Sequence, residues 1–192
     1  MSVLHTTVAN KHIAKCKQFR EFTINLINKN NCYNEMQKYS IQLNESLKDY
    51  KYCLLECKNM KSTDVETLNK KLAKHDEKIE KILSVYNTKI EGFKESRKAH
   101  REDFVKMFDE MVYERNLGDL EEADFQYCSS IVDEAMAELA IAKNKYEKTN
   151  AQIMQSHFEI EKMIKGLENK DIVIEYKLCR IPLFFKELKS FA

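Results

Sequence analysis

The side chains that most often carry out chemistry are scattered along this chain. Five histidines are spread over the sequence, namely His5, His12, His75, His100 and His157. None of them has the carboxylate or cysteine neighbours that a catalytic triad needs. Cys53 and Cys57 share one face of a helix, but no further Cys or His is near enough in sequence to complete a zinc site. Without a Gly-rich phosphate loop or a nucleophile elbow, the sequence predicts no enzyme, no cofactor and no metal.

The cysteines bear on the compartment of the protein. They are Cys16, Cys32, Cys53, Cys57, Cys128 and Cys179. The start of the chain lacks the apolar core of a secretory signal, so we expect buried, reduced thiols and a cytoplasmic location. The alternative is a secreted helical binding protein whose signal has been removed and whose six cysteines form disulfides. The glycosylation sequon at Asn44 favours that alternative.

A lysine-rich stretch is the strongest candidate for a binding surface. Residues 70–101 hold ten Lys and Arg against five Asp and Glu, whereas residues 102–138 hold two against twelve. The net charge of +1 therefore hides a polarised chain. The stretch is either a solvated helix face or a surface that attracts anionic lipid headgroups, worth about 1 kcal/mol per nearby basic residue. Nucleic acid is not expected, because no aromatic residues interleave on an exposed face.

Composition indicates that long helices position these side chains. Three glycines and one proline in 192 residues cannot supply the turns of a β-rich or α/β fold. Apolar residues recur at alternating spacings of three and four, which predicts supercoiled helix packing along a continuous seam. No apolar run approaches the roughly 20 residues that span a bilayer. We expect one all-α domain over residues 1–192, with helices over about 6–59, 63–116 and 119–190.

Local signals mark the boundaries of the second helix. Thr63 and Glu66 form a capping box at its start, and Gly118 fits a left-handed cap after its end. Asp119 with Glu122 is expected to cap the third helix.

Two further interruptions are predicted. Residues 28–31 have poor helix propensity and interrupt the first helix, either as a kink or as a turn. We favour the kink, because the apolar stripe resumes at Tyr33. Pro182 is expected to kink or restart the last helical turns.

The C-terminal stretch is expected to be a dimer interface. A bundle of three antiparallel helices has a thin core and exposes much of its third helix. The density of Phe and Ile over residues 172–191 suggests that a second copy covers this end, as a homodimer. The expected interface residues are Ile174, Leu178, Ile181, Phe184, Phe185 and Leu188.

Two segments resemble the BAR domain superfamily, whose members are banana-shaped helical dimers that sense or bend membranes. Residues 81–90, with Leu83 and Tyr86 in a Leu-x-x-Tyr element, look like a helix approaching its mid-arm. Residues 158–176 and 181–185 look like the closing helix of the family, which ends in an aromatic cluster near the dimer centre. Similar patterns occur in the Chibby-interacting BAR branch, which is associated with the base of cilia.

The resemblance implies three long, kinked, antiparallel helices in an elongated coiled-coil bundle, and a crescent homodimer whose concave face binds acidic phospholipids. The lipid-binding candidates that it implies are Lys70, Lys71, Lys74, Lys78, Lys81, Lys89, Arg97, Lys98, Arg101, Lys143, Lys145 and Lys148. One departure concerns the tip between the second and third helices, which is basic in many membrane-bending members. The acidic residues at this tip are Glu110, Glu114, Asp119, Glu121, Glu122 and Asp124.

The leading hypothesis is therefore a peripheral membrane protein, a dimer that senses or scaffolds membrane curvature by binding acidic phospholipids. The acidic tip should be repelled by an anionic leaflet. It favours an alternative, a dimeric coiled-coil adaptor that binds protein partners without intrinsic membrane affinity.

Overall fold

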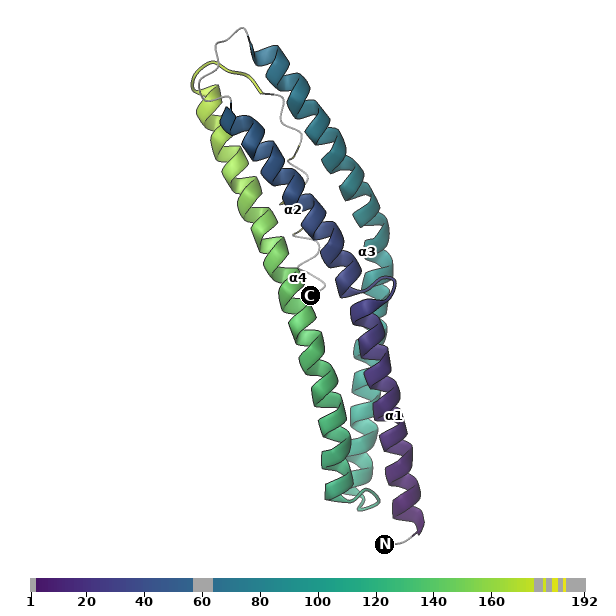
Figure 1. The fold of residues 1–192 in the computed structure, drawn as a ribbon. Coiled ribbons are helices and arrows are strands. Elements are labelled where there is room, and N and C mark those ends of the chain that lie inside the picture. Colours follow the sequence, from purple (N-terminus) through teal and green to yellow (C-terminus); the bar gives the residue numbers. More distant parts are fainter. Residues whose placement is uncertain (1–2, 57–63, 175–177, 179–180, 183–184, 186–192) are drawn as a thin grey trace. The chain divides into compact units, whose positions relative to one another are not determined.

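The expectation of an all-α fold is confirmed. A computed structural model describes residues 3–56, 64–174, 178, 181–182 and 185, and these contain helices but no strands. The helices are α1 (Val3–Asn28), α2 (Tyr33–Glu56), α3 (Val65–Asn116) and α4 (Glu122–Glu168) (Figure 1). The second predicted helix corresponds to α3, although its expected N-cap, Thr63, lies outside the described residues.

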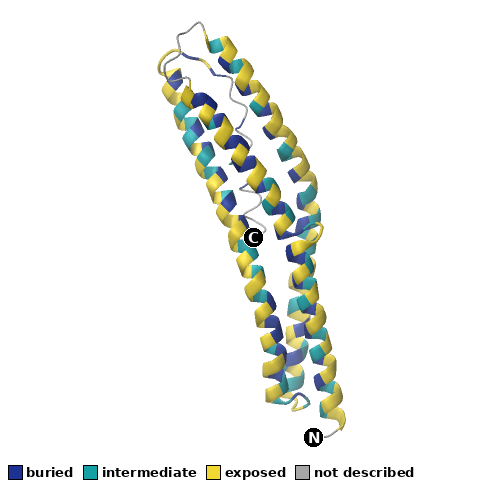
Figure 2. Cartoon of the chain, viewed as in Figure 1, coloured by how far each residue is buried: buried dark blue, intermediate teal, exposed yellow. Residues whose placement is uncertain are grey.

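The chain divides into two compact units. Unit 1 comprises residues 1–35 and 90–144, and unit 2 comprises residues 36–89 and 145–192. Helices α3 and α4 pass through both units, whereas α1 belongs to unit 1 and almost all of α2 to unit 2. Buried residues recur along each helix with exposed residues between them (Figure 2). This is the pattern expected when each helix buries one stripe against its neighbours.

Unit 1 is held together by an apolar cluster from α1, α3, α4 and the α3–α4 turn. Its buried members are Ala9, Cys16, Phe19, Met107, Met111, Leu120, Phe125, Cys128, Ile131 and Val132. Helix α1 runs antiparallel to α3, because Lys15 pairs with Glu110 while Thr23, later in α1, bonds to His100. The His100 ring stacks on Phe19 with centroids 4.6 Å apart.

Unit 2 contains a polar layer inside its apolar core. The hydroxyl of Tyr86, on α3, is hydrogen-bonded to Ser40 on α2 at 3.1 Å and to Tyr146 on α4 at 2.5 Å. Ser40 also donates to Asn150 at 2.8 Å. Burial raises the pKa of Tyr86 well above its ordinary value, so its hydroxyl stays protonated. Because the bonded groups lie at fixed positions on three helices, this layer favours one register between them.

The interruption expected at residues 28–31 is a turn rather than the favoured kink. Helix α1 ends at Asn28, α2 begins at Tyr33, and Asn31 between them has a φ of 56°. Asn tolerates this left-handed conformation better than most residues do. The Asn31 side chain lies against Gly92 of α3, where an added Cβ would be 2.6 Å from the Asn31 Nδ2 atom.

The left-handed cap expected at Gly118 is confirmed, with a φ of 81°. The Gly118 amide donates to the Arg115 carbonyl and the Asp119 amide to the Glu114 carbonyl, both at 3.0 Å, as in a Schellman motif. The prediction of Asp119 as the next N-cap is wrong. The Asp119 and Leu120 amides bond back to Glu114, so the chain leaves the turn later and α4 starts at Glu122.

The prediction that the third helix continues to residue 190 is also wrong. Helix α4 ends at Glu168, and Asp171 follows with a φ of 59°. The Ile172 amide bonds to the Leu167 carbonyl, and both side chains are buried, which is the apolar contact that accompanies a Schellman ending. Ile181, Pro182 and Phe185 are helical, which fits a restart near Pro182.

Two glycines in helices differ in what surrounds them, and this gives a test of the turn. Gly166 has no atom within 4 Å of an added Cβ, so Gly166→Ala should raise the free energy of unfolding by about 0.5–1 kcal/mol through helix propensity. Gly92→Ala should gain little, because its methyl group displaces Asn31, and should recover the gain in an Asn31→Gly background. Urea unfolding followed by circular dichroism measures the unmodified protein, the two single alanine variants, Asn31→Gly and the double variant Asn31→Gly/Gly92→Ala. Equal gains in both single alanine variants would contradict the observed contact.

Two buried histidines predict how stability depends on pH. Burial lowers the pKa of His100 and of His157, which is only 2% exposed and bonds through Nε2 to the Leu178 carbonyl at 3.0 Å. As the pH falls below the ordinary histidine value of about 6.5, the unfolded chain takes up protons first, so stability is full above this pH and declines below it. The urea midpoint should therefore drop between pH 7.5 and 5.5, and His100→Gln and His157→Gln should each reduce the drop. If the urea midpoint falls as far in both variants as in the unmodified protein, the two histidines do not cause the pH dependence.

Candidate functional site: lysines on the solvent face of α3

Five of the predicted lysines lie together on α3 within unit 2. Their spacing places Lys70, Lys74, Lys78 and Lys81 along one side of the helix, with Lys71 beside them, and all five are exposed. The core residues of this part of α3, such as Leu72 and Ile79, occupy the opposite side and are buried. The five lysines are named the lysine face.

Most of the charge on the lysine face is available to a ligand. Lys70 pairs with Glu66 at 3.0 Å and Lys81 with Glu77 at 3.1 Å. All four of these side chains are strongly exposed, and exposed pairs of this kind are weak and screened by salt. Within the described part of the chain, Lys71, Lys74 and Lys78 have no carboxylate within 4 Å. Three of the five lysines therefore form no ion pair in this part of the structure.

The other lipid-binding candidates do not share this environment. Lys89 is half-buried, and Arg97, in unit 1, is half-buried with its guanidinium 5.5 Å from the centroid of the Tyr33 ring. That contact gives Arg97 a role in packing. Lys98 lies 3.9 Å from Glu102, while Arg101 is exposed. The three candidates on α4 are Lys143, which is half-buried, and Lys145 and Lys148, which are exposed.

The two units carry opposite net charges. Unit 2 has 20 Lys and Arg against 15 Asp and Glu, whereas unit 1 has 12 against 16. The lysine face thus belongs to a unit with an excess of five positive charges. The polarity noted in the sequence is a property of whole units and not of α3 alone.

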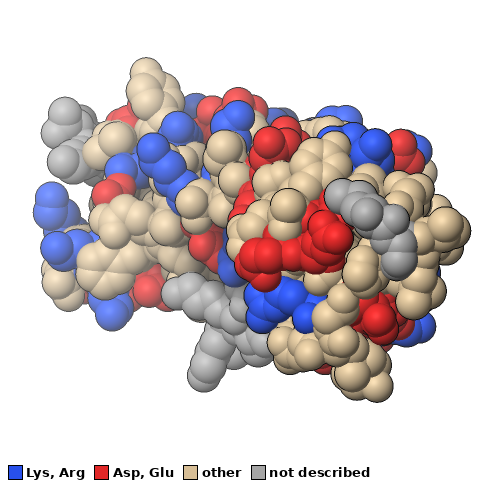
Figure 3. Space-filling view, turned by 90° about the horizontal axis from the view of Figure 1, so that it is seen from below, with Lys and Arg blue, Asp and Glu red and all other residues tan. Residues whose placement is uncertain are grey.

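Much of the acidic tip is paired with basic groups on α1. The end of unit 1 that carries the α3–α4 turn shows gathered Asp and Glu side chains (Figure 3). Glu110 accepts a bond from Lys15 at 2.5 Å, and this pairing lowers the pKa of Glu110. Glu114 lies 2.6 Å from the buried His12 and Glu121 lies 3.6 Å from His5. Sequence reasoning missed these pairs, because they link residues about 100 positions apart.

The expected dimer-interface residues are buried inside one chain. Ile174, Leu178, Ile181 and Phe185 are at most 5% exposed, and Phe185 packs near Tyr86 with ring centroids 6.4 Å apart. Phe184 and Leu188 lie outside the described residues. These four side chains are therefore buried by their own chain, and covering them does not require a second copy.

Several further features bear on function. Cys16, Cys32, Cys53 and Cys128 are buried and none of these four forms a disulfide, while Cys57 and Cys179 lie outside the described residues. Over the described ranges, no group of three or more His, Cys, Asp or Glu is arranged to hold a metal ion. None of the described helices is both long and apolar enough to span a membrane.

Comparisons with known proteins found no match. No protein-family model matches this chain, and neither a curated protein nor a solved structure matches it. Membership of the BAR domain superfamily accordingly stays a hypothesis that rests on the residue patterns given above.

Proposed function

We propose that this protein binds anionic membrane surfaces peripherally, through the lysine face of α3. The observation that carries the proposal is the set of five exposed lysines along one side of a helix, three of which have no carboxylate within 4 Å in the described structure. At about 1 kcal/mol per basic residue near an anionic leaflet, five lysines would supply about 5 kcal/mol. That corresponds to more than three orders of magnitude in affinity over a neutral surface.

A BAR-type homodimer that senses or scaffolds curvature is the more specific form of this proposal. The helical architecture and the resemblance of residues 81–90 support it. Lys15, which pairs with Glu110, and Lys11, which lies 3.8 Å from Glu114, also weaken the objection that an acidic tip raises. A dimer mass in solution and tighter binding to small than to large vesicles would distinguish curvature sensing from simple adsorption.

Charge reversal on the lysine face tests membrane binding directly. The variant Lys70→Glu/Lys74→Glu/Lys78→Glu should bind vesicles of phosphatidylserine in phosphatidylcholine at least about 100-fold more weakly than the unmodified protein. The matched control reverses three exposed lysines of unit 1, Lys17, Lys29 and Lys106, and changes the net charge equally. Co-sedimentation of all three proteins, with pure phosphatidylcholine vesicles as a blank, provides the measurement.

The control should keep most of the binding, because its substitutions lie outside the proposed surface. Equal losses in the two variants would mean that only net charge matters. Binding by the unmodified protein that is independent of anionic lipid would rule the proposal out.

A protein-binding adaptor is the second candidate, favoured by exposed apolar side chains on α3 in unit 1. Val105 is 50% exposed and Phe108 is 39% exposed, and Phe108 stacks on Phe104 with ring centroids 5.8 Å apart. Apolar side chains that remain in water on one helix are a common feature of protein interfaces. The adaptor function predicts that charge reversal on the lysine face leaves partner binding intact.

A further inference from the structure

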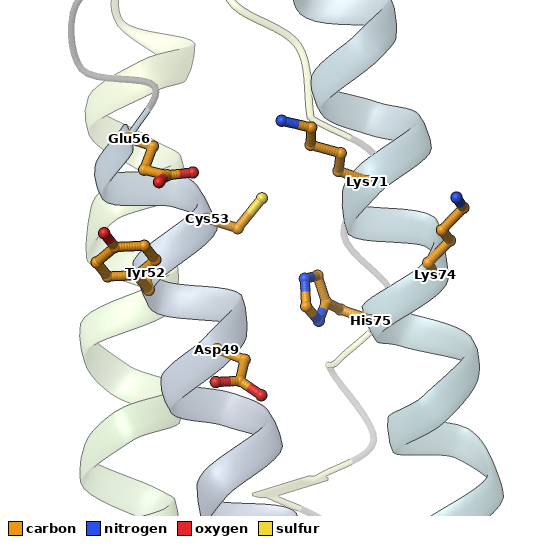
Figure 4. A pocket seen from close by; sticks show the side chains of 7 residues that line it. All are labelled: Asp49, Tyr52, Cys53, Glu56, Lys71, Lys74 and His75. Carbon is orange, nitrogen blue, oxygen red and sulfur yellow. The ribbon is translucent and has the colours of Figure 1, made fainter.

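A cavity of about 400 Å³, open to solvent and lined mostly by exposed side chains, lies between α2 and α3 in unit 2. It is lined by Asp49, Tyr52, Cys53, Glu56, Lys71, Lys74 and His75. Lys71 and His75 extend from α3 toward α2, and the thiol of Cys53 faces them (Figure 4). The volume falls within the usual range of small-molecule sites.

The two walls of this cavity carry opposite charge. Helix α2 contributes the carboxylates Asp49 and Glu56, and α3 contributes Lys71 and Lys74 with the His75 imidazole beside them. In the described structure, none of these charged groups forms an ion pair within 4 Å. Lys71 and His75 thus point toward the helix that carries the two carboxylates, whereas Lys74 points away from α2 at the edge of the cavity (Figure 4). A molecule between the two helices could contact groups of both charges.

A second cavity in unit 1 shows the contrasting case. It has a volume of about 360 Å³ and is also lined by basic and acidic groups, including Lys15 and Glu110. There the lysine bonds directly to the glutamate at 2.5 Å, so their charges are already satisfied. Asp103 and Lys106 also line this second cavity and form no ion pair within 4 Å in the described structure, but both lie on α3. Of these two cavities, the one in unit 2 is therefore the one with unpaired charges on both walls.

We infer that the cavity of unit 2 binds a small zwitterion that carries a phosphate and a primary ammonium, of which phosphoethanolamine is the simplest example. A phosphate offers several acceptor oxygens and up to about two negative charges, which suit Lys71 and the His75 imidazole, with the charge of Lys74 nearby. An ammonium donates three hydrogen bonds, which suit Asp49 and Glu56 on the facing wall. A simple anion would be repelled by the carboxylates, and a simple cation would be repelled by the lysines. Each alone therefore gains little binding free energy.

This inference does not depend on the proposed membrane binding, although Lys71 and Lys74 belong both to the lysine face and to the lining of the cavity. The ligand chemistry could come from a free metabolite or from the headgroup of a phospholipid. A monoester probe represents the first source, and glycerophosphoethanolamine, a diester, represents the second. Both are water-soluble, so the measurement needs no vesicle, and failure of the membrane proposal would leave its outcome unchanged.

Calorimetric titration of the purified protein tests the site. Phosphoethanolamine or glycerophosphoethanolamine should bind saturably and at least about tenfold more tightly than inorganic phosphate or ethanolamine alone. Lys71→Gln and Glu56→Gln should each weaken this binding about tenfold or more, because each removes the partner of one charge. The matched controls Lys70→Gln and Glu45→Gln change exposed residues of the same helices outside the cavity and should have little effect.

The probes also decide the source of the ligand. Preference for the monoester indicates a free metabolite, and equal or tighter binding of the diester indicates a lipid headgroup. Inorganic phosphate that binds as tightly as the zwitterions would reduce the cavity to a simple anion site and overturn the inference. So would the absence of saturable binding by every probe, or unchanged binding in Glu56→Gln.

Discussion

Tyr86→Ala is expected to lower the free energy of unfolding by about 3–5 kcal/mol, the usual cost of removing a large buried aromatic side chain. The Tyr86 side chain is fully buried, and its hydroxyl joins Ser40 of α2 and Tyr146 of α4. The alanine variant therefore loses apolar packing and also removes the central group of the polar layer. Urea unfolding followed by circular dichroism measures the loss.

Two companion variants separate these contributions. Tyr86→Phe keeps the ring and removes only the hydroxyl, so it should cost about 1–3 kcal/mol. Val85→Ala alters the adjacent residue, which is 45% exposed, and should cost no more than about 0.5 kcal/mol. If Tyr86→Ala costs no more than Val85→Ala, then α2, α3 and α4 do not pack around Tyr86 in solution as described.

Ile181→Ala should lower the free energy of unfolding by about 2–5 kcal/mol, because Ile181 is fully buried in unit 2. The stronger test is the dependence on protein concentration. Residues that pack within their own chain give an unfolding midpoint that is independent of concentration, whereas residues at a subunit interface give one that rises with it.

The midpoints of the unmodified protein and of Ile181→Ala should therefore differ by the same amount at every protein concentration. Val173→Ala, at a site 71% exposed on the same segment, is the matched control and should leave the midpoint nearly unchanged. If the difference between the two midpoints instead grows as the protein is diluted, the C-terminal residues form a dimer interface.

The parts of the fold that were predictable depend on local sequence. The long helix α3 follows from the regular spacing of apolar residues and the absence of breakers, and its end follows from Gly118 in the left-handed region. The end of α4 depends on Asp171 adopting a left-handed conformation that the buried pair Leu167 and Ile172 stabilises. Asp rarely marks a helix end in this way, so the apolar pattern beyond it predicts more helix than the structure has.

The candidate site shows the same division. The lysine face was predictable, because residues spaced by three and four share one side of any helix. The different environment of Arg97 was not predictable, because it depends on the Tyr33 ring lying beside the guanidinium. The cavity of unit 2 was equally hidden, because no sequence signal places Glu56 opposite Lys71. A cluster of apolar residues near the C-terminus likewise does not reveal whether its partner is the same chain or another copy.

The reactivity of the buried thiols reports how often each unit opens locally. Cys16 and Cys128 lie in the core of unit 1, where their mutual hydrogen bond and burial raise the pKa of Cys16, while the same hydrogen bond lowers the pKa of Cys128. Cys53 lies in unit 2, and burial raises its pKa as well. A buried thiol reacts with an alkylating reagent only when its surroundings open and let the reagent reach it. The alkylation rates of the three cysteines would therefore time the opening of each unit separately. Because α3 and α4 run through both units, correlated rates would indicate that these two helices transmit unfolding from one unit to the other.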